Sequence, residues 1–213
     1  MNGLVLCLDA GNTKSYPGSG TTWTDLSGNG NNGTLTNGPT YSSSNGGYIS
    51  FDGTDDYISF SNPLVVNTNS GFTIELMSYI SNTQNNTQWS YFYSNGISSW
   101  EIGTFGTSPG SFLFKDTGTV GTPLVSCPIL SPWQHIVFGC NARQAFIYNN
   151  LSYSTNATLF RNTDISISNL NRSQATSSRY FKTNQAIIRI YNRALTAAEI
   201  QQNFNALRGR FGI

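Results

Sequence analysis

Short runs of alternating apolar and polar residues recur along this chain, separated by residues that favour turns. Two of them, Tyr48–Phe51 and Tyr57–Phe60, alternate with a period of two, which is typical of strands with one buried face. Asp52 and Gly53 lie between them. A short acidic loop between two such runs predicts a β-hairpin.

Further strands are expected where β-branched and aromatic residues gather. The candidates are residues 72–80, 89–93, 100–105, 112–114, 133–138, 145–148, 165–167 and 186–191. The fifth and sixth candidates look like a hairpin that turns at Asn141–Arg143. Many short strands with regular turn signals predict an all-β sandwich or barrel.

One segment near the C-terminus has helical periodicity instead. Thr196, followed three residues later by Glu199, forms the capping box that begins many helices. Apolar residues then recur on one helical face at Ile200, Phe204 and Leu207. Gly209 is expected to end the helix. The pattern predicts one short amphipathic helix, at about residues 197–207, packed on the strands.

The composition favours one domain with an aromatic core and little charge. The chain has 213 residues, of which 13% are aromatic and 10% are charged. This length is usual for one β-sandwich, so we expect a single domain over residues 1–213. A net charge of +1 gives no field that would attract nucleic acid or an anionic membrane. Neither a membrane-spanning stretch nor a signal peptide is recognisable.

Four blocks of sequence, taken in order, carry a family resemblance. They are Trp23–Leu35, Ile49–Ile58, Pro132–Val137 with Ile147–Asn150, and Arg189–Ile200. Together they resemble the laminin-G-like domains of the concanavalin A-like lectin/glucanase superfamily. The resemblance implies an antiparallel two-sheet jelly-roll sandwich with the short helix near the C-terminus. Glu75–Ile80 departs from the pattern, because the family often has a tryptophan-bearing strand there.

Catalytic residues are scarce. Some relatives are glucanases, which the resemblance implies carry paired carboxylates on one strand, often spaced E-x-D-x-x-E. The glutamates here are Glu75, Glu101 and Glu199, and none has an acidic partner at that spacing. His135 is the only histidine and lies in a strand-like run, which favours a structural role over a catalytic or zinc-binding one. We therefore expect no enzyme, with glycoside hydrolysis as the less favoured alternative.

Calcium is the cofactor that the sequence supports best. Calcium prefers carboxylate, amide and carbonyl oxygens, and the resemblance implies a site at the rim of the sandwich. The candidate ligands are Asp9, Asn12, Asp25, Asp52, Asp55 and Asp56. In the alternative interpretation these side chains shape turns by bonding to backbone N–H groups. Ala186 and Ile187 weaken the calcium prediction, because the family often has acidic residues at those positions.

Glycan binding is the commonest activity that the resemblance implies. Sugars stack their apolar faces on exposed aromatic rings, and the candidate rings are Trp89, Tyr91, Tyr93 and Trp100. Strand alternation would place the first three on one face. The alternative is that these rings fill the core.

The setting is suggested by the opening segments Leu8–Asn12 and Tyr16–Gly20, which resemble those of tailed-bacteriophage structural proteins. The expectation is a non-catalytic structural or adhesion protein of the virion: a capsid decoration, a head fibre or a tail-associated module. It would be made in the host cytoplasm and lie on the particle surface. Its partners would be other virion proteins, further copies of itself and a host or environmental polysaccharide. The alternative is a free-standing carbohydrate-binding lectin.

Overall fold

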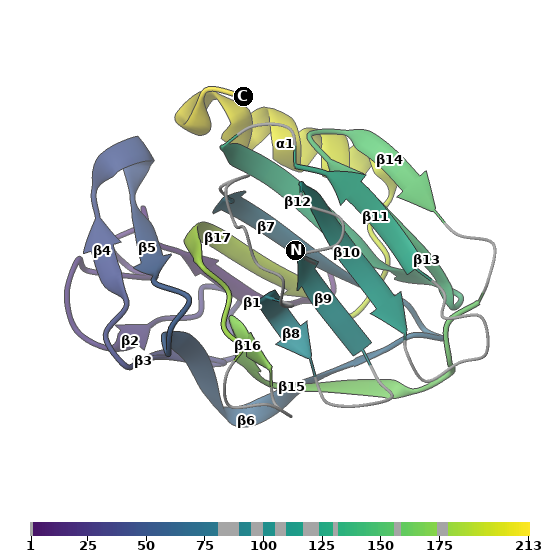
Figure 1. The fold of residues 1–213 in the computed structure, drawn as a ribbon, viewed down its shortest axis with the longest axis horizontal. Coiled ribbons are helices and arrows are strands. Elements are labelled where there is room, and N and C mark those ends of the chain that lie inside the picture. The colour runs from purple at the N-terminus through teal and green to yellow at the C-terminus, as the bar shows by residue number, and fades with distance from the viewer. Residues whose placement is uncertain are drawn as a thin grey trace.

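Strands dominate the computed structural model. It describes residues 2–80, 90–94, 100–104, 110–116, 124–129, 132–155, 159–173 and 179–213. Within these residues the strands form three sheets, of eight, five and four strands. The sheets make two layers, with one helix outside them (Figure 1). The prediction of an all-β sandwich with a C-terminal helix is therefore confirmed.

The eight-stranded sheet forms one layer. Its order is β14-β13-β12-β7-β17-β5-β4, and β1 also pairs with β17. Every pairing in this sheet is antiparallel. The strands are β1 (Leu4–Asp9), β4 (Thr40–Ser42), β5 (Tyr48–Phe51), β7 (Phe72–Tyr79), β12 (Trp133–Asn141), β13 (Gln144–Asn149), β14 (Ser152–Thr155) and β17 (Thr183–Tyr191).

The second layer is divided between the two smaller sheets. The five-stranded sheet comprises β8 (Ser90–Ser94), β9 (Trp100–Thr104), β10 (Ser111–Asp116), β11 (Leu124–Pro128) and β16 (Arg172–Ser173). The four-stranded sheet comprises β2 (Thr22–Trp23), β3 (Gly33–Thr36), β6 (Tyr57–Asn67) and β15 (Asp164–Leu170). The short β16 pairs with β8 in parallel, an exception to the antiparallel pattern expected. The hydroxyl of Tyr93 on β8 donates to the carbonyl of Ser166 on β15 and so links the two sheets.

The core lies between the layers and is rich in aromatic rings. Phe138 of β12 contacts Phe112 and Phe114 of β10, with ring centroids 5.8 and 5.6 Å apart. Phe72 of β7 contacts Phe114 from the same side. Edge-on and tilted arrangements such as these are favourable between rings, so the aromatic composition fastens the eight-stranded sheet to the strands above it.

Helix α1 (Ala197–Phe211) covers the outer face of the eight-stranded sheet, alongside β12 (Figure 1). The capping box of Thr196 and Glu199 is present, as predicted. The predicted end at Gly209 is wrong. The helix continues because the Phe211 ring packs on Trp133 with centroids 4.7 Å apart, and Gly212, with a φ of 69°, supplies the left-handed cap. In the described residues, no helix has the length and apolar character to cross a bilayer.

The predicted hairpin between Tyr48–Phe51 and Tyr57–Phe60 is wrong. The first run is β5 of the eight-stranded sheet, whereas the second begins β6 of the four-stranded sheet. Both runs alternate because each buries one face, but they bury it from opposite layers. The acidic loop of residues 52–56 therefore crosses from one layer to the other. The second predicted hairpin, β12–β13, is confirmed.

Candidate functional site

The rings predicted to stack on sugars are largely unsuited to it. Tyr93 and Trp100 are fully buried, and the Trp100 ring lies against Phe160 with centroids 5.0 Å apart. The prediction that these two rings face solvent is wrong, because their strands turn them inward onto the core. Trp89 lies outside the described residues. Tyr91 lies on β8, but its side chain is also outside the described part.

A groove lies instead on the outer face of the eight-stranded sheet, where β13 and β14 meet the start of α1. The meander β12–β13–β14 is built with two tight turns, Ala142–Arg143 and Asn150–Leu151, whose residues all have positive φ. Such two-residue turns match the twist of paired strands and fix their register. As a result Tyr148 lies opposite Tyr153, and Phe146 lies opposite Thr155.

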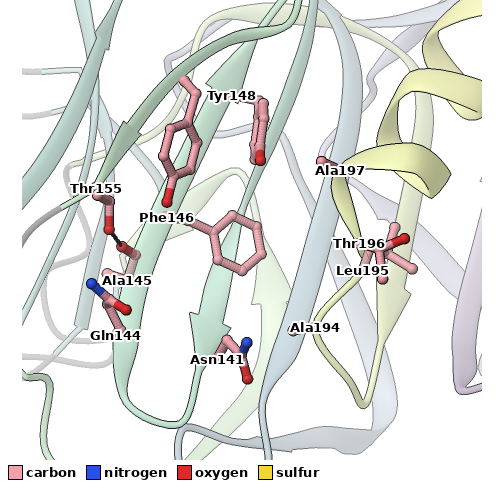
Figure 2. Close-up of a pocket in the computed structure, with 11 residues that line it drawn as sticks. Asn141, Gln144, Ala145, Phe146, Tyr148, Thr155, Ala194, Leu195, Thr196 and Ala197 are labelled. Atoms are coloured by element: carbon pink, nitrogen blue, oxygen red, sulfur yellow. Dashed lines mark hydrogen bonds between the residues drawn. The ribbon is translucent and has the colours of Figure 1, made fainter.

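Aromatic rings form the floor of the groove (Figure 2). The Tyr148 and Tyr153 rings are 4.8 Å apart between centroids and are tilted by 42°. Phe146 meets Tyr148 edge-on at 6.1 Å. Tyr153 is 55% exposed. Its ring is therefore not part of the core and is accessible to a ligand. Burial raises the pKa of Tyr148, so its hydroxyl stays protonated and can donate a hydrogen bond at neutral pH.

Polar groups line the groove beside the rings. Asn141 and Gln144 are exposed and face each other across the end of the β12–β13 hairpin. Residues 194–197, just before and at the start of α1, form the opposite wall (Figure 2). The volume of the groove is about 240 Å³. A concave surface that offers aromatic rings together with several polar groups can hold a polar ligand.

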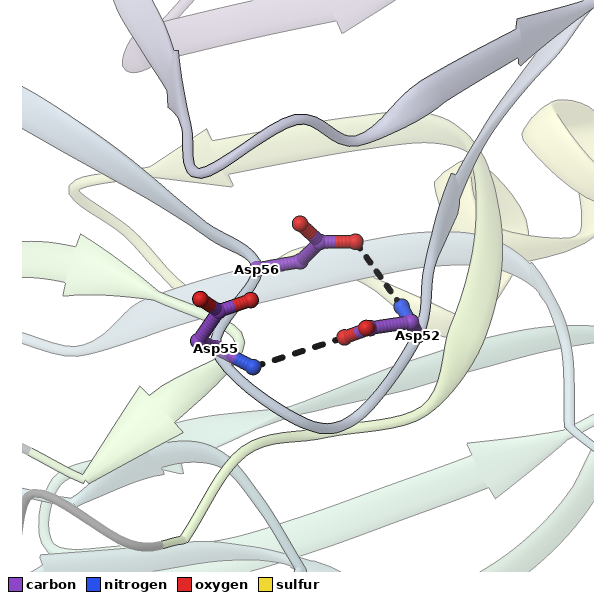
Figure 3. Close-up of side chains that lie close together, drawn as sticks. All are labelled: Asp52, Asp55 and Asp56. Atoms are coloured by element: carbon purple, nitrogen blue, oxygen red, sulfur yellow. Dashed lines mark hydrogen bonds between the residues drawn. The ribbon is translucent and has the colours of Figure 1, made fainter.

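The acidic loop brings three of the predicted calcium ligands together. Carboxylate oxygens of Asp52, Asp55 and Asp56 all lie within 4.8 Å of one another. Asp52 also accepts hydrogen bonds from the backbone N–H groups of Thr54 and Asp55, and Asp56 accepts one from Asp52 (Figure 3). The turn-shaping interpretation is thus confirmed, whereas calcium binding here stays a prediction.

The pKa values of this loop differ in direction. Burial pushes the pKa of Asp52 upward, but hydrogen bonds from the backbone of Thr54 and Asp55 outweigh it and leave the pKa below its ordinary value. Burial raises the pKa of Asp56, and the charge of Asp52 adds to that rise. The carboxylates of this loop therefore repel one another, and a bound proton or cation would reduce that repulsion.

The other predicted calcium ligands do not join this cluster. Asp25 is buried, and its two carboxylate oxygens accept bonds from the backbone of Cys7, Ser27 and Asn31. Asp9 forms an ion pair with Arg210 of α1 at 2.9 Å. Asn12 accepts a bond from the backbone of Lys14. Asp25 and Asn12 thus organise loops, and Asp9 holds the helix. These are structural roles, in agreement with the alternative to calcium binding.

A buried polar cluster lies beneath α1, away from the groove residues. Glu75 of β7 is fully buried, and one carboxylate oxygen lies 2.6 Å from Nε2 of His135. The other oxygen accepts bonds from Asn203 of α1 at 3.0 Å, Arg189 at 3.3 Å and the Tyr191 hydroxyl at 3.4 Å. Burial favours the protonated acid, but the His135 bond and the Arg189 charge outweigh it and lower the pKa of Glu75.

The two-layered sandwich with a helix on its outer face is a lectin-like jelly-roll fold. The chain belongs to the concanavalin A-like lectin/glucanases superfamily, whose laminin-G family model matches residues 52–201. No curated protein matches the chain in sequence.

Solved structures share the fold at low sequence identity. Domain 4 of AbnA, an extracellular arabinanase from Geobacillus stearothermophilus in complex with arabinotriose, has a TM-score of 0.68 and 16% identity; 93% of this chain and 97% of that one are covered. The receptor-binding domain of botulinum neurotoxin type G has a TM-score of 0.63 and 16% identity, covering 97% and 51%.

A third neighbour, the Trypanosoma rangeli sialidase in complex with sialic acid, has a TM-score of 0.67 and 17% identity, covering 97% and 33%. The chain thus spans about half the length of the toxin domain and a third of that of the sialidase.

Sequence reasoning did not find the groove. Strand β14 was not expected, because Ser152–Thr155 is short and polar. A local signal was present: Asn150 begins a turn, after which Tyr153 and Thr155 alternate with serines. The contribution of residues 194–197 had no such signal, since they are distant in sequence.

Proposed function

We propose that this chain is a non-catalytic carbohydrate-binding domain, and that a sugar residue binds in the groove formed by β13, β14 and the start of α1. The observation that carries this proposal is the pair Tyr148 and Tyr153, of which Tyr153 is more than half exposed. An aromatic surface of this kind matches the apolar face of a sugar ring. The two hydroxyls and the amides of Asn141 and Gln144 supply hydrogen bonds for sugar hydroxyls.

Family membership supports the same function. The superfamily is described by its lectins and glucanases, and the similar AbnA domain was solved with arabinotriose. That domain is covered almost over its whole length, so the resemblance extends to the complete sandwich.

Catalysis is not part of the proposal, because each glutamate already has another role. Glu75 is sealed beneath α1. Glu101 forms an ion pair with Lys115 at 3.0 Å. Glu199 caps the helix. Glycoside hydrolysis requires two carboxyl groups flanking the scissile bond, and these three glutamates occupy separate places in the fold.

A glycan array followed by titration calorimetry tests the proposal. The Tyr153→Ala variant is expected to lose at least about tenfold in affinity for any glycan that binds, because a stacking surface is removed. Tyr153→Phe keeps the ring and is expected to retain most of the affinity. Val65→Ala is the matched control, since Val65 is 54% exposed on β6 of the other layer. Equal affinity of Tyr153→Ala and the wild type would refute the groove as the site.

We further propose that the domain acts on the surface of a bacteriophage particle, attached to other virion proteins. The support is the resemblance of Leu8–Asn12 and Tyr16–Gly20 to tailed-bacteriophage structural proteins. Several copies on one particle would strengthen a weak sugar interaction through multivalency. Mass spectrometry of purified particles tests this setting: the chain should be found in stoichiometric amounts, and its absence would contradict the proposal.

A further inference from the structure

We infer that the groove selects uncharged sugar residues and rejects those carrying carboxylate or sulfate groups. This inference rests on the proposed function and adds the chemical class of the ligand. It follows from the charges in and around the groove.

The described residues that line the groove carry no ionisable group except the tyrosine hydroxyls. The polar side chains are those of Asn141, Gln144, Thr155 and Thr196, beside the two tyrosines. Proteins bind carboxylates and phosphates chiefly with arginine, lysine or free backbone N–H groups. An anionic sugar placed over Phe146 and the tyrosines would lose water around its charge without gaining a cation, which is unfavourable.

The start of α1 is the one feature that would attract an anion, because the first N–H groups of a helix carry partial positive charge. That position is already filled. The Glu199 carboxylate accepts bonds from both the backbone N–H and the hydroxyl of Thr196. Arg193 bonds to this carboxylate, and together with the Thr196 backbone it lowers the pKa of Glu199 to about 2. Glu199 therefore stays ionised and occupies this position, with Arg193 as its counter-ion.

The two arginines adjacent in sequence to the lining residues are directed elsewhere. Arg193 bonds to Glu199 through both terminal nitrogens, at 2.9 and 2.6 Å, and its Nε donates to the carbonyl of Asn2. Arg143 lies in the β12–β13 turn, and its Nε donates to the carbonyl of Phe160 at 2.6 Å. The charge of Arg193 is therefore balanced by Glu199, the Nε of Arg143 is turned to Phe160, and neither guanidinium group is among the residues that line the groove.

The size of the groove limits the ligand as well. Its volume of about 240 Å³ is below the range of about 300–1,000 Å³ common for pockets that hold drug-sized ligands. The groove therefore accommodates a short stretch of glycan. The ligand class that fits is a neutral hexose or pentose residue, either at the end of a glycan or within an accessible stretch of it.

Paired glycans test the inference. Neutral oligosaccharides should be printed beside their sialylated, uronic acid and sulfated counterparts, and hits measured by calorimetry. We expect binding to members of the neutral set, with affinities at least about tenfold weaker for the anionic counterparts. Affinity should also stay constant from about 0.1 to 1 M NaCl, because no ion pair is screened.

Three outcomes separate the hypotheses. Binding that prefers the anionic members would overturn the inference but leave the proposed function intact. Binding to neutral and anionic members alike would also overturn it. Binding to neither set would overturn both the inference and the function on which it rests.

A charge introduced into the groove gives an independent test. Gln144 is exposed in the groove, so Gln144→Lys adds a cation to the lining without disturbing the core. The variant is expected to gain at least about tenfold in affinity for the anionic counterparts. Val65→Lys adds the same charge on the other layer and should leave the preference unchanged. A gain in both variants, or in neither, would contradict a selectivity set inside the groove.

Discussion

Replacing Glu75 by glutamine tests how α1 is held on the sheet. Glutamine has the same shape but no charge, so Arg189 loses its carboxylate partner and the amide presents hydrogens to donors such as Asn203. The two shortest bonds at this carboxylate come from His135 at 2.6 Å and Asn203 at 3.0 Å. Hydrogen bonds to charged groups contribute about 1.5–3 kcal/mol each, and breaking a buried ion pair costs about 3–5 kcal/mol.

We therefore expect Glu75→Gln to lower the free energy of unfolding by about 3–5 kcal/mol at neutral pH. For a chain of this size, each kcal/mol lowers Tm by roughly 2–4 °C. Urea unfolding followed by tryptophan fluorescence measures the change. A loss below about 1 kcal/mol would refute the view that this carboxylate anchors the helix.

The contribution of Glu75 to stability should depend on pH. The pKa of Glu75 is lower in the folded protein than its ordinary value of 4.5. Its contribution is therefore fully present above pH 4.5 and declines as the pH falls through the lower folded value. The stability difference between wild type and Glu75→Gln should be constant at neutral pH and shrink in acid. A difference that grew on acidification would contradict the assigned shift.

Two further outcomes are expected. Gly209→Ala should stabilise the protein by about 0.5–1 kcal/mol in thermal unfolding, because Gly209 lies inside α1 and an added methyl group would meet no atom within 4 Å. A loss of stability would mean that the helix is broken there. Calcium at the acidic loop predicts a heat of binding in calorimetry that Asp55→Asn reduces, and its absence from the wild type would overturn the calcium prediction.

Local patterns were sufficient to predict most strands and the start of the helix. Alternation reveals a strand whenever one face is buried, and a capping box is complete within four residues. Alternation does not say which layer a strand joins, so the runs on either side of Asp52 were paired wrongly. It also fails where both faces are covered: residues of β7 from Phe72 to Ser78 are all buried, because α1 covers the outer face.

The candidate site was harder to predict, because it depends on which rings face solvent. Trp100 and Tyr153 are both aromatic residues on short strands, yet Trp100 is buried and Tyr153 is exposed. The difference arises because the eight-stranded sheet covers the inner face of β9, whereas α1 leaves this part of the outer face of β14 open. The residues next to Trp100 and Tyr153 in the sequence give no indication of which ring is buried.

The helix connects stability with the groove, since its first residues form one wall. Thr196→Ala removes the side-chain cap and should cost about 1 kcal/mol of stability. Gly212→Ala places a methyl group at a φ of 69° and should cost a similar amount, about 1 kcal/mol, at the other end of the helix. Only Thr196 borders the groove.

We therefore expect the two variants to have similar Tm values but different affinities for a bound glycan, with the weaker binding in Thr196→Ala. Calorimetry well below both Tm values measures this difference. Equal affinities would mean that the start of α1 is a support for the fold and not part of the binding surface. Because the two variants match in stability, a loss of affinity seen only in Thr196→Ala identifies the start of α1 as a contact for the ligand.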